Sequence, residues 1–383
     1  MESSNLISII SVIAVFVSLL LAFFLLTVPT KNKLGNFLLA AFIILNAIDL
    51  SGWFIYHITK NHPDLEVFRW SVSWLINPVF FLYALSVCFS DFHLKIKHLL
   101  HAIPFLLYNL FLLPKVYLAD LTAKTHFITY YGDSEARKIF SVLGHLQFIF
   151  YVIAILLVLK KYRKIYLENY ADNTTITYKW LFQLTVVIII VHSIVTLKDL
   201  LMYISSRDIF NGAQIIVGVN AVFILCWFVL KALYSPDLFR GIDSKTEPAE
   251  SLTPISPNKK QQPKEAVIPE NNKDILKIRN YMTLQEPYLE PSLTIQDLAD
   301  QLEMPVRDLS ILINNQLDQH FFDFVNEYRI EKAMRILKDP ARSNLTILEI
   351  LYEIGFNSKS SFNASFRKYT SLTPTEYRRK HQQ

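Results

Sequence analysis

Long apolar runs constrain this chain more than any other feature of its sequence. The first, ISIISVIAVFVSLLLAFFLL at residues 7–26, contains no charge. A bilayer core about 30 Å thick is crossed by about 20 apolar residues of helix. Seven stretches approach this length and composition, at residues 5–29, 36–57, 68–89, 98–113, 139–160, 179–204 and 209–233. We therefore predict an all-α fold that begins with a seven-helix transmembrane bundle over residues 1–240.

The number of spans decides on which side of the membrane the rest of the chain lies. The fourth stretch is the weakest, because it contains His98, His101, Pro104 and Asn109. Six spans are the alternative. Seven spans place the two ends of the bundle on opposite sides of the membrane.

Charged residues in the loops indicate the orientation. Glu2 stands where a signal peptide has a basic leader, so we expect the first span to be retained. With the N-terminus outside, the inner loops are richer in Lys and Arg, for example in KKYRK at residues 160–164. We expect a multi-pass protein of the bacterial cytoplasmic membrane, with its C-terminal part in the cytoplasm.

Several polar residues fall inside the predicted spans, where they are costly and often functional. Most lie at mid-depth or in the outer half, which would suit a ligand pocket open to the outside. The candidates for this pocket are Asp49, Asn77, His145, His192, Lys198 and Asp199. The alternative is that these groups only satisfy one another between helices.

Residues 241–272 change the character of the chain. This segment contains five prolines, many polar residues and no helical period. We predict a disordered linker that tethers the C-terminal domain at residues 273–383 without fixing its position. Roughly 30 flexible residues span on the order of 30 Å, so a rigid push from the last span would be poorly transmitted.

Helical periodicity returns after the linker. Residues 275–282 form one amphipathic pattern, and residues 295–302 and 306–313 form two short helices separated by a break at Glu303–Pro305. A longer helix follows from about Phe321 to Leu337. A second pair is predicted at residues 346–354 and 359–369, joined at Gly355 and with Phe362, Phe366 and Tyr369 on the buried side. Two helix-turn-helix units therefore flank one linking helix.

At these residues the sequence resembles the arabinose-regulator (AraC) family of bacterial transcription factors, over roughly residues 275–380. The residues that carry the resemblance are Leu298, Ala299, Arg329, Ala333, Gly355, Phe356, Phe362, Phe366, Arg367, Lys368, Thr373, Pro374, Tyr377 and Arg378. The sequence departs from the family pattern at Asp318 and Ser371, which replace turn glycines, and at Leu351, which replaces an alanine.

The resemblance implies a seven-helix domain whose two reading helices enter adjacent major grooves of DNA. Carried over by position, base-reading candidates are Arg307, Ser310 and Ile311 in the first unit and Lys359, Ser360, Asn363 and Ala364 in the second. Phosphate-binding candidates are Asn314, Asn357, Arg367, Lys368 and Arg378. Residues 273–383 contain 15 basic and 15 acidic side chains, so positive charge is local to the last 25 residues and binding is expected to need a homodimer or the membrane.

These observations predict a one-component membrane sensor that couples an external or membrane cue to transcription. The expected partners are double-stranded DNA, the lipid bilayer, a small ligand or membrane cue, and a second copy of the chain. The alternative is a transporter or membrane enzyme with an appended DNA-binding domain that controls its own expression. No catalytic residues, metal or cofactor are expected, since Cys88 and Cys226 lie in apolar runs and no nucleophile or metal-ligand pattern appears.

Overall fold

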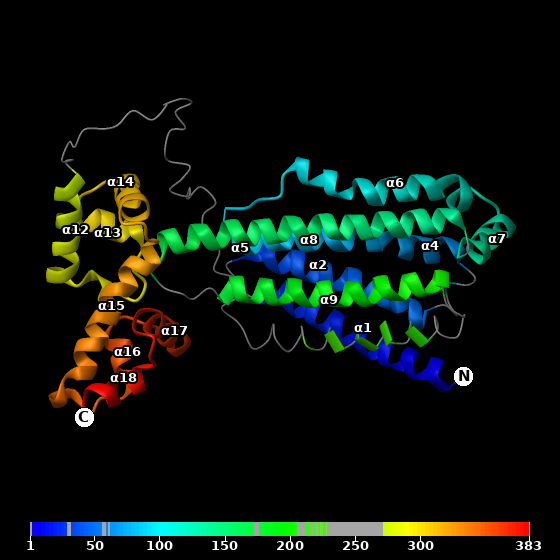
Figure 1. Ribbon diagram of the computed structural model, residues 1–383. Helices are drawn as coiled ribbons and strands as arrows, with labels where there is room; N and C mark the ends of the chain where they lie inside the picture. Colours follow the sequence, from blue (N-terminus) through cyan, green and yellow to red (C-terminus); the bar gives the residue numbers. More distant parts are fainter. Residues whose placement is uncertain are drawn as a thin grey trace. The chain divides into compact units, whose positions relative to one another are not determined.

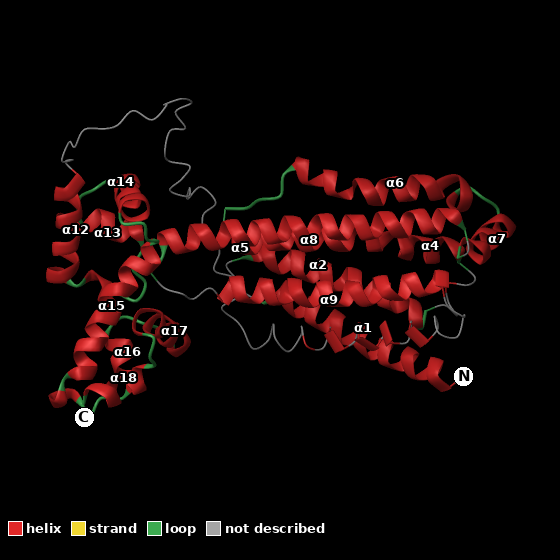
Figure 2. Ribbon diagram, viewed as in Figure 1, coloured by secondary structure: helices red, strands yellow, loops and turns green. Residues whose placement is uncertain are grey.

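The computed structural model describes residues 2–28, 32–55, 59, 62–89, 91–132, 134–171, 176–204, nine residues between 212 and 227, and 271–382. Every regular element in this part of the chain is a helix (Figures 1 and 2). The chain divides into two compact units. The first comprises residues 1–160 and 176–244, and the second comprises residues 161–175 and 245–383.

The first unit is a bundle of apolar helices. Six described segments are long and apolar enough to cross a membrane: Ser8–Thr27, Lys33–Trp53, Pro63–Cys88, Ile96–Tyr117, Glu135–Asn169 and Tyr178–Leu201. They coincide with the first six predicted spans, including the weak fourth. Of the predicted seventh, at residues 209–233, the structure describes nine separate residues, and the predicted linker, at residues 241–272, lies outside the described residues except for its last two.

Three helices of this bundle are used repeatedly below. They are α2 (Lys33–Leu50), α8 (Glu135–Asn169) and α9 (Ile176–Ile204), which are labelled in Figure 1. The other bundle helices are α1 (Glu2–Thr27), α4 (Pro63–Val72), α5 (Ile76–Cys88), α6 (Ile103–Leu112) and α7 (Leu121–Tyr131).

The outward faces of the bundle are apolar. Phe16 and Phe23 of α1 are 61% and 67% exposed, and Leu107 of α6 and Phe150 of α8 are also exposed. Side chains of this size are rarely clustered on a surface that meets water.

The second unit contains the C-terminal domain, with seven α-helices as the resemblance implied. They are α12 (Asn271–Gln285), α13 (Ile295–Gln301), α14 (Val306–Ile311), α15 (Phe321–Lys338), α16 (Ile347–Glu353), α17 (Lys359–Thr370) and α18 (Pro374–His381). A π-helical turn at Leu312–Gln316 extends α14. The predicted long linking helix is α15, which ends one residue later than expected.

Two hydrophobic cores hold this domain together. The first is built around α12 to α14 and the first half of α15, and the second around the other half of α15 with α16 to α18. Leu298, Ile313, Phe362 and Phe366 are all fully buried, as their helical spacing predicted. Tyr369 differs from the prediction, because it is 37% exposed and its hydroxyl donates to the main-chain oxygen of Asp323 at 2.8 Å.

In the turns between these helices, single residues adopt the left-handed backbone conformation, at positions that the sequence predicted to be turns. Gly355 has φ +85°, and Asp318 and Ser371, which replace family glycines, have φ 52° and 61°. Glu303, at the break between α13 and α14, has φ 51°. Asp318 and Ser371 therefore form the same turns as the glycines they replace. Their side chains add backbone strain, which glycine in the left-handed region would not have.

Candidate nucleic-acid interface and helix-bundle cavity

A cavity of about 790 Å³ lies within the helix bundle. Its walls come from α2, α5, α8 and α9, with aromatic side chains of α4, α6 and α7 at one end. All six predicted pocket residues line it: Asp49, Asn77, His145, His192, Lys198 and Asp199. Asp49 of α2 and Asp199 of α9 are 150 residues apart in sequence, so the bundle brings the set together.

Four of these residues form a connected polar group. The Nδ1 atom of His145 lies 3.0 Å from Nε2 of His192, and Nε2 of His145 lies 3.3 Å from the Asp199 carboxylate. The same carboxylate pairs with the Lys198 ammonium at 2.8 Å. This mutual bonding is the arrangement that the alternative interpretation expected. The four side chains nevertheless also border the cavity.

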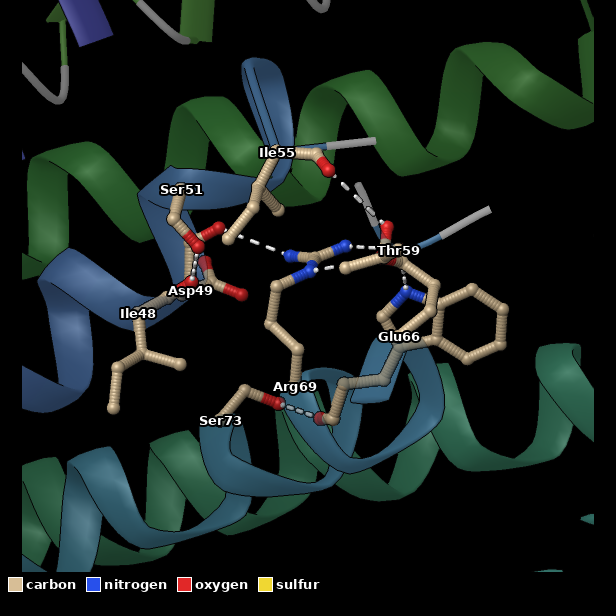
Figure 3. Close-up of polar contacts among 9 residues, drawn as sticks. Ile48, Asp49, Ser51, Ile55, Thr59, Glu66, Arg69 and Ser73 are labelled. Carbon is tan, nitrogen blue, oxygen red and sulfur yellow. Dashed lines mark hydrogen bonds and ion pairs between the residues drawn. The ribbon is translucent and has the colours of Figure 1, made fainter. Parts of the chain in front are cut away.

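Asp49 differs from this group. Its side chain borders the cavity, and within the described residues its carboxylate has no hydrogen-bond or ion-pair partner at contact distance, although the Arg69 and Lys198 cations lie near enough to act on it electrostatically. A neighbouring network fixes the main chain at this point instead. Arg69 of α4 donates to the main-chain oxygen of Asp49 at 3.0 Å and pairs with Glu66 at 2.6 Å (Figure 3).

Glu66 is the centre of that network. Besides Arg69, its carboxylate accepts the Thr59 hydroxyl at 3.0 Å and the Trp70 indole N–H at 2.9 Å (Figure 3). These partners tie the end of α2 to α4 beside the cavity. Through Arg69, the Glu66 network thus fixes the main chain at Asp49.

Capping residues define where the two helix-turn-helix units begin their first helices. Thr294 and Asp297 form a reciprocal capping box at the start of α13, and Thr346 and Glu349 form one at the start of α16. In the second box, main-chain and hydroxyl hydrogen bonds from Thr346 lower the pKa of Glu349. The Glu349 carboxylate is therefore charged at neutral pH, and this is the form that accepts the two hydrogen bonds from Thr346.

The reading helix of the second unit presents its first turn to solvent. Ser358 caps α17, and Lys359 and Ser360 directly after it are exposed, as is Ala364 one turn later. Asn363 is partly exposed. In helix-turn-helix proteins this end of the second helix contacts base edges. All four predicted base-reading residues of this unit therefore lie on an accessible face.

The reading helix of the first helix-turn-helix unit, α14, is less exposed. Arg307 of α14 is exposed and Ile311 is partly exposed, but Ser310 is only 8% exposed. The Asn314 amide donates to the main-chain oxygen of Ser310 at 2.9 Å and contacts its hydroxyl at 3.2 Å. Arg307 is thus the most accessible base-reading candidate of the three.

The predicted phosphate-binding residues have different surroundings. Asn357 and Arg367 are exposed, whereas Lys368 is exposed but pairs with Asp323 of α15 at 2.6 Å. Arg378 is partly buried, and its Nε and Nη2 atoms are buried without a hydrogen-bond partner among the described residues. As placed, these two donors are therefore not open to a phosphate group, unlike the exposed side chain of Arg367.

Sequence reasoning did not identify what Arg329 does. This side chain of α15 is 1% exposed and donates to three main-chain oxygens, those of Tyr288 at 2.6 Å, Glu290 at 2.8 Å and Ala171 at 3.1 Å. The sequence marks Arg329 only as one of the residues that carry the family resemblance, with no role assigned. Its acceptors are main-chain oxygens, which every residue type carries, so the sequence does not identify them.

Comparison with known proteins agrees with this geometry. Residues 298–380 match the family model of a helix-turn-helix domain. Over 92 residues, 24% of either chain, the sequence is 37% identical to the uncharacterized transcriptional regulatory protein YesN of Bacillus subtilis. It is 30% identical over 93 residues to the HTH-type transcriptional regulator CdhR of Pseudomonas aeruginosa, which is 24% of this chain and 27% of that one.

A third relative is the melibiose operon regulatory protein of Escherichia coli, 28% identical over 94 residues, or 24% of this chain and 30% of that one. The chain thus spans about a quarter to a third of the length of these relatives. No solved structure matches. The helices, the caps and these similarities agree that the C-terminal part of the chain is a helix-turn-helix domain of the AraC type.

Proposed function

We propose that this chain is a membrane-embedded, sequence-specific DNA-binding regulator of transcription that responds to a ligand bound in its helix bundle. The observation that carries the DNA-binding part is the exposed first turn of α17, where Lys359 and Ser360 follow the Ser358 cap. The relatives named above are transcription regulators that are similar over this same domain.

Embedding in the cytoplasmic membrane is supported by the six long apolar helices and by the large apolar side chains on the outside of the bundle. The DNA-binding domain requires access to the chromosome, so its side of the membrane is the cytoplasm. The charge pattern of the loops agrees with this orientation.

The sensing role rests on the cavity. A volume of about 790 Å³ falls within the range of small-molecule sites, which combine mostly apolar walls with a few placed polar groups. Asp49 supplies a carboxylate that accepts no hydrogen bond from the described residues, and Trp70, Trp74 and Tyr108 supply aromatic walls. The cavity is the proposed site of the cue.

Regulation of transcription from the membrane is tested by mapping where the tagged full chain binds the genome of its source organism. The regulator should be recovered in the membrane fraction and should enrich discrete sites. Lys359→Ala should stay in the membrane fraction at equal abundance and lose those sites. Enrichment that is uniform along the chromosome, or sites unchanged by Lys359→Ala, would contradict the proposal.

The same sites then test sensing. Asp49→Asn removes the free carboxylate with little change in volume, and it should abolish the response of the adjacent genes to growth conditions without changing site occupancy in vitro. Asp120→Asn is a matched control, because Asp120 caps α7 and is not among the residues that line the cavity. Loss of uptake of a solute together with the response would instead favour a transporter.

A further inference from the structure

Two charged side chains in the wall of the bundle cavity have no partner of opposite charge at contact distance. Among the described residues, the side chains with a formal charge that line the cavity are Asp49, Arg137, Lys198 and Asp199. The Lys198 ammonium and the Asp199 carboxylate pair with each other at 2.8 Å. The other two, Asp49 and Arg137, form no ion pair with each other or with another residue that the structure describes.

The two cations that act on Asp49 are each paired with another carboxylate. Arg69 and Lys198 act on Asp49 electrostatically, but the Arg69 guanidinium pairs with Glu66 at 2.6 Å and the Lys198 ammonium pairs with Asp199. Arg69 donates only to the main-chain oxygen of Asp49, at 3.0 Å (Figure 3). The Asp49 carboxylate oxygens therefore remain available as acceptors, because no donor among the described residues binds them.

Arg137, near the start of α8, offers the matching donors. Its Nη1 donates to the main-chain oxygen of Gly132 at 2.9 Å. Its Nε and Nη2 have no hydrogen-bond partner in the part of the chain that the structure describes. These two atoms form one edge of the guanidinium, which can bind both oxygens of a carboxylate at once.

An aromatic stack connects the two unpaired charges. Arg69, which binds the main chain of Asp49, is followed in α4 by Trp70. The oxygen that Arg137 binds belongs to the residue after Tyr131. The rings of Trp70 and Tyr131 stack with their centres 5.5 Å apart, and both rings line the cavity. A molecule that reaches both charges therefore lies against aromatic faces.

The signs of the two charges restrict the ligand. An unpaired charge is costly in a helix bundle surrounded by lipid, and such side chains tend to be functional. A ligand with a single positive charge would pair with Asp49 and leave Arg137 without a counter-ion, and a ligand with a single negative charge would do the reverse. A molecule that carries both charges pairs with both residues and brings no net charge into the bundle.

We propose that the cavity binds a zwitterion, with its ammonium group at the Asp49 carboxylate and its own carboxylate at the Arg137 guanidinium. This assignment rests on the proposed function, since it names the chemistry of the cue that the cavity would sense. The faces of Trp70 and Tyr131 attract a neighbouring ammonium group through cation–π interaction.

The rest of the cavity indicates the body of the ligand. The volume of about 790 Å³ exceeds what an ammonium and a carboxylate fill, and much of the remaining wall is apolar, as at Phe42, Phe80 and Leu184. Mostly apolar walls with a few placed polar groups are typical of sites for ligands with an apolar body. The ligand class is therefore an amino acid or a short peptide with apolar side chains.

Calorimetric titration of the full chain in nanodiscs of phosphatidylglycerol, a lipid without an ammonium group, tests this class. The probes are phenylalanine and the dipeptide phenylalanyl-phenylalanine, each compared with its N-acetyl form, which lacks the ammonium, and its amide, which lacks the carboxylate. At least one zwitterion should bind at least tenfold more tightly than both of its blocked forms. The tighter of the two probes shows whether the cue is a free amino acid or a peptide.

Two variants assign the charged groups. Asp49→Asn should weaken binding of the tighter zwitterion at least tenfold and leave binding of its N-acetyl form unchanged, because that form has no ammonium to lose. Arg137→Gln should likewise weaken binding of the zwitterion and leave that of its amide unchanged. Asp120→Asn, at the α7 cap and not among the lining residues, should bind every probe as the unmodified chain does.

The comparison of blocked and free probes on the unmodified chain keeps the test decisive even where a variant does not fold. Equal affinity for a zwitterion and its blocked forms, no binding of any probe, or equal losses of the free and N-acetyl forms in Asp49→Asn would overturn the proposal. Calorimetry involves neither DNA nor transcription. Zwitterion binding by a chain whose target genes do not respond would therefore contradict the proposed function and support the ligand class.

Discussion

Substituting Gly355 by alanine should destabilise the DNA-binding domain more than any other single methyl group added to a turn. A side chain at φ +85° costs about 1–2 kcal/mol. The new Cβ would also lie 2.7 Å from two main-chain oxygens, those of Tyr288 and Leu289, which cannot rotate away. Relief of such overpacking typically costs about 1–3 kcal/mol. Together these effects predict a loss of about 2–5 kcal/mol, a large share of the roughly 5–15 kcal/mol that stabilises a domain.

Pulse proteolysis of the full chain in lipid nanodiscs, as a function of urea concentration, measures this loss. With a urea dependence of about 1–3 kcal/mol per M, the unfolding midpoint of the C-terminal domain should fall by about 2 M. Gly355→Asn separates the two causes, because asparagine tolerates the left-handed region but carries the same Cβ. Gly355→Asn should therefore still lose the overpacking part, about 1–3 kcal/mol. A midpoint unchanged in Gly355→Ala, or fully restored in Gly355→Asn, would refute the close approach to the carbonyl groups.

Three further predictions concern the same domain. Ser371→Gly should raise its stability by about 1 kcal/mol in the same assay, since glycine relieves the strain of φ 61°; a loss would show that the Ser371 side chain makes a contact of its own. Hydrogen bonds from the Thr373 main chain and hydroxyl lower the pKa of Glu376 below its ordinary 4.5. The ionised cap therefore stabilises the domain above that pH, and this stabilisation is lost as the pH falls further. Glu376→Gln should flatten the dependence of unfolding free energy on pH between pH 6 and pH 3, and an unchanged dependence would contradict this role of the cap. In binding assays Lys359→Ala should relax base preference, whereas Arg367→Ala should weaken binding to all sequences and lower the salt slope by about 1; equal loss of selectivity in both would refute their assigned roles.

Local patterns predicted much of the fold. Helical spacing located the cores, and the turn positions were visible because Gly355 and the family-glycine positions Asp318 and Ser371 stood between amphipathic runs. The cavity residues were found for a similar reason, since a polar side chain within a membrane span is conspicuous. Their depth along each helix, at mid-depth or in the outer half, suggested one pocket, and all six line the same cavity.

Other features depended on contacts that the sequence does not encode locally. The Arg329 guanidinium binds the main-chain oxygen of Ala171, which is 158 residues away, and every residue type offers the same carbonyl group. The burial of Ser310 and the exposure of Tyr369 reflect packing against α15 and the turn after α14, not helical period. Tertiary packing decided these positions.

Selection of random duplex DNA by the purified full chain, repeated over a series of salt concentrations, tests the central claim most directly. A reader with two helix-turn-helix units predicts a bipartite motif whose halves lie about one helical turn, or ~10 bp, apart. It also predicts a steep loss of affinity as salt rises. Failure to enrich any sequence at low salt, by a chain whose C-terminal domain is folded, would contradict the account.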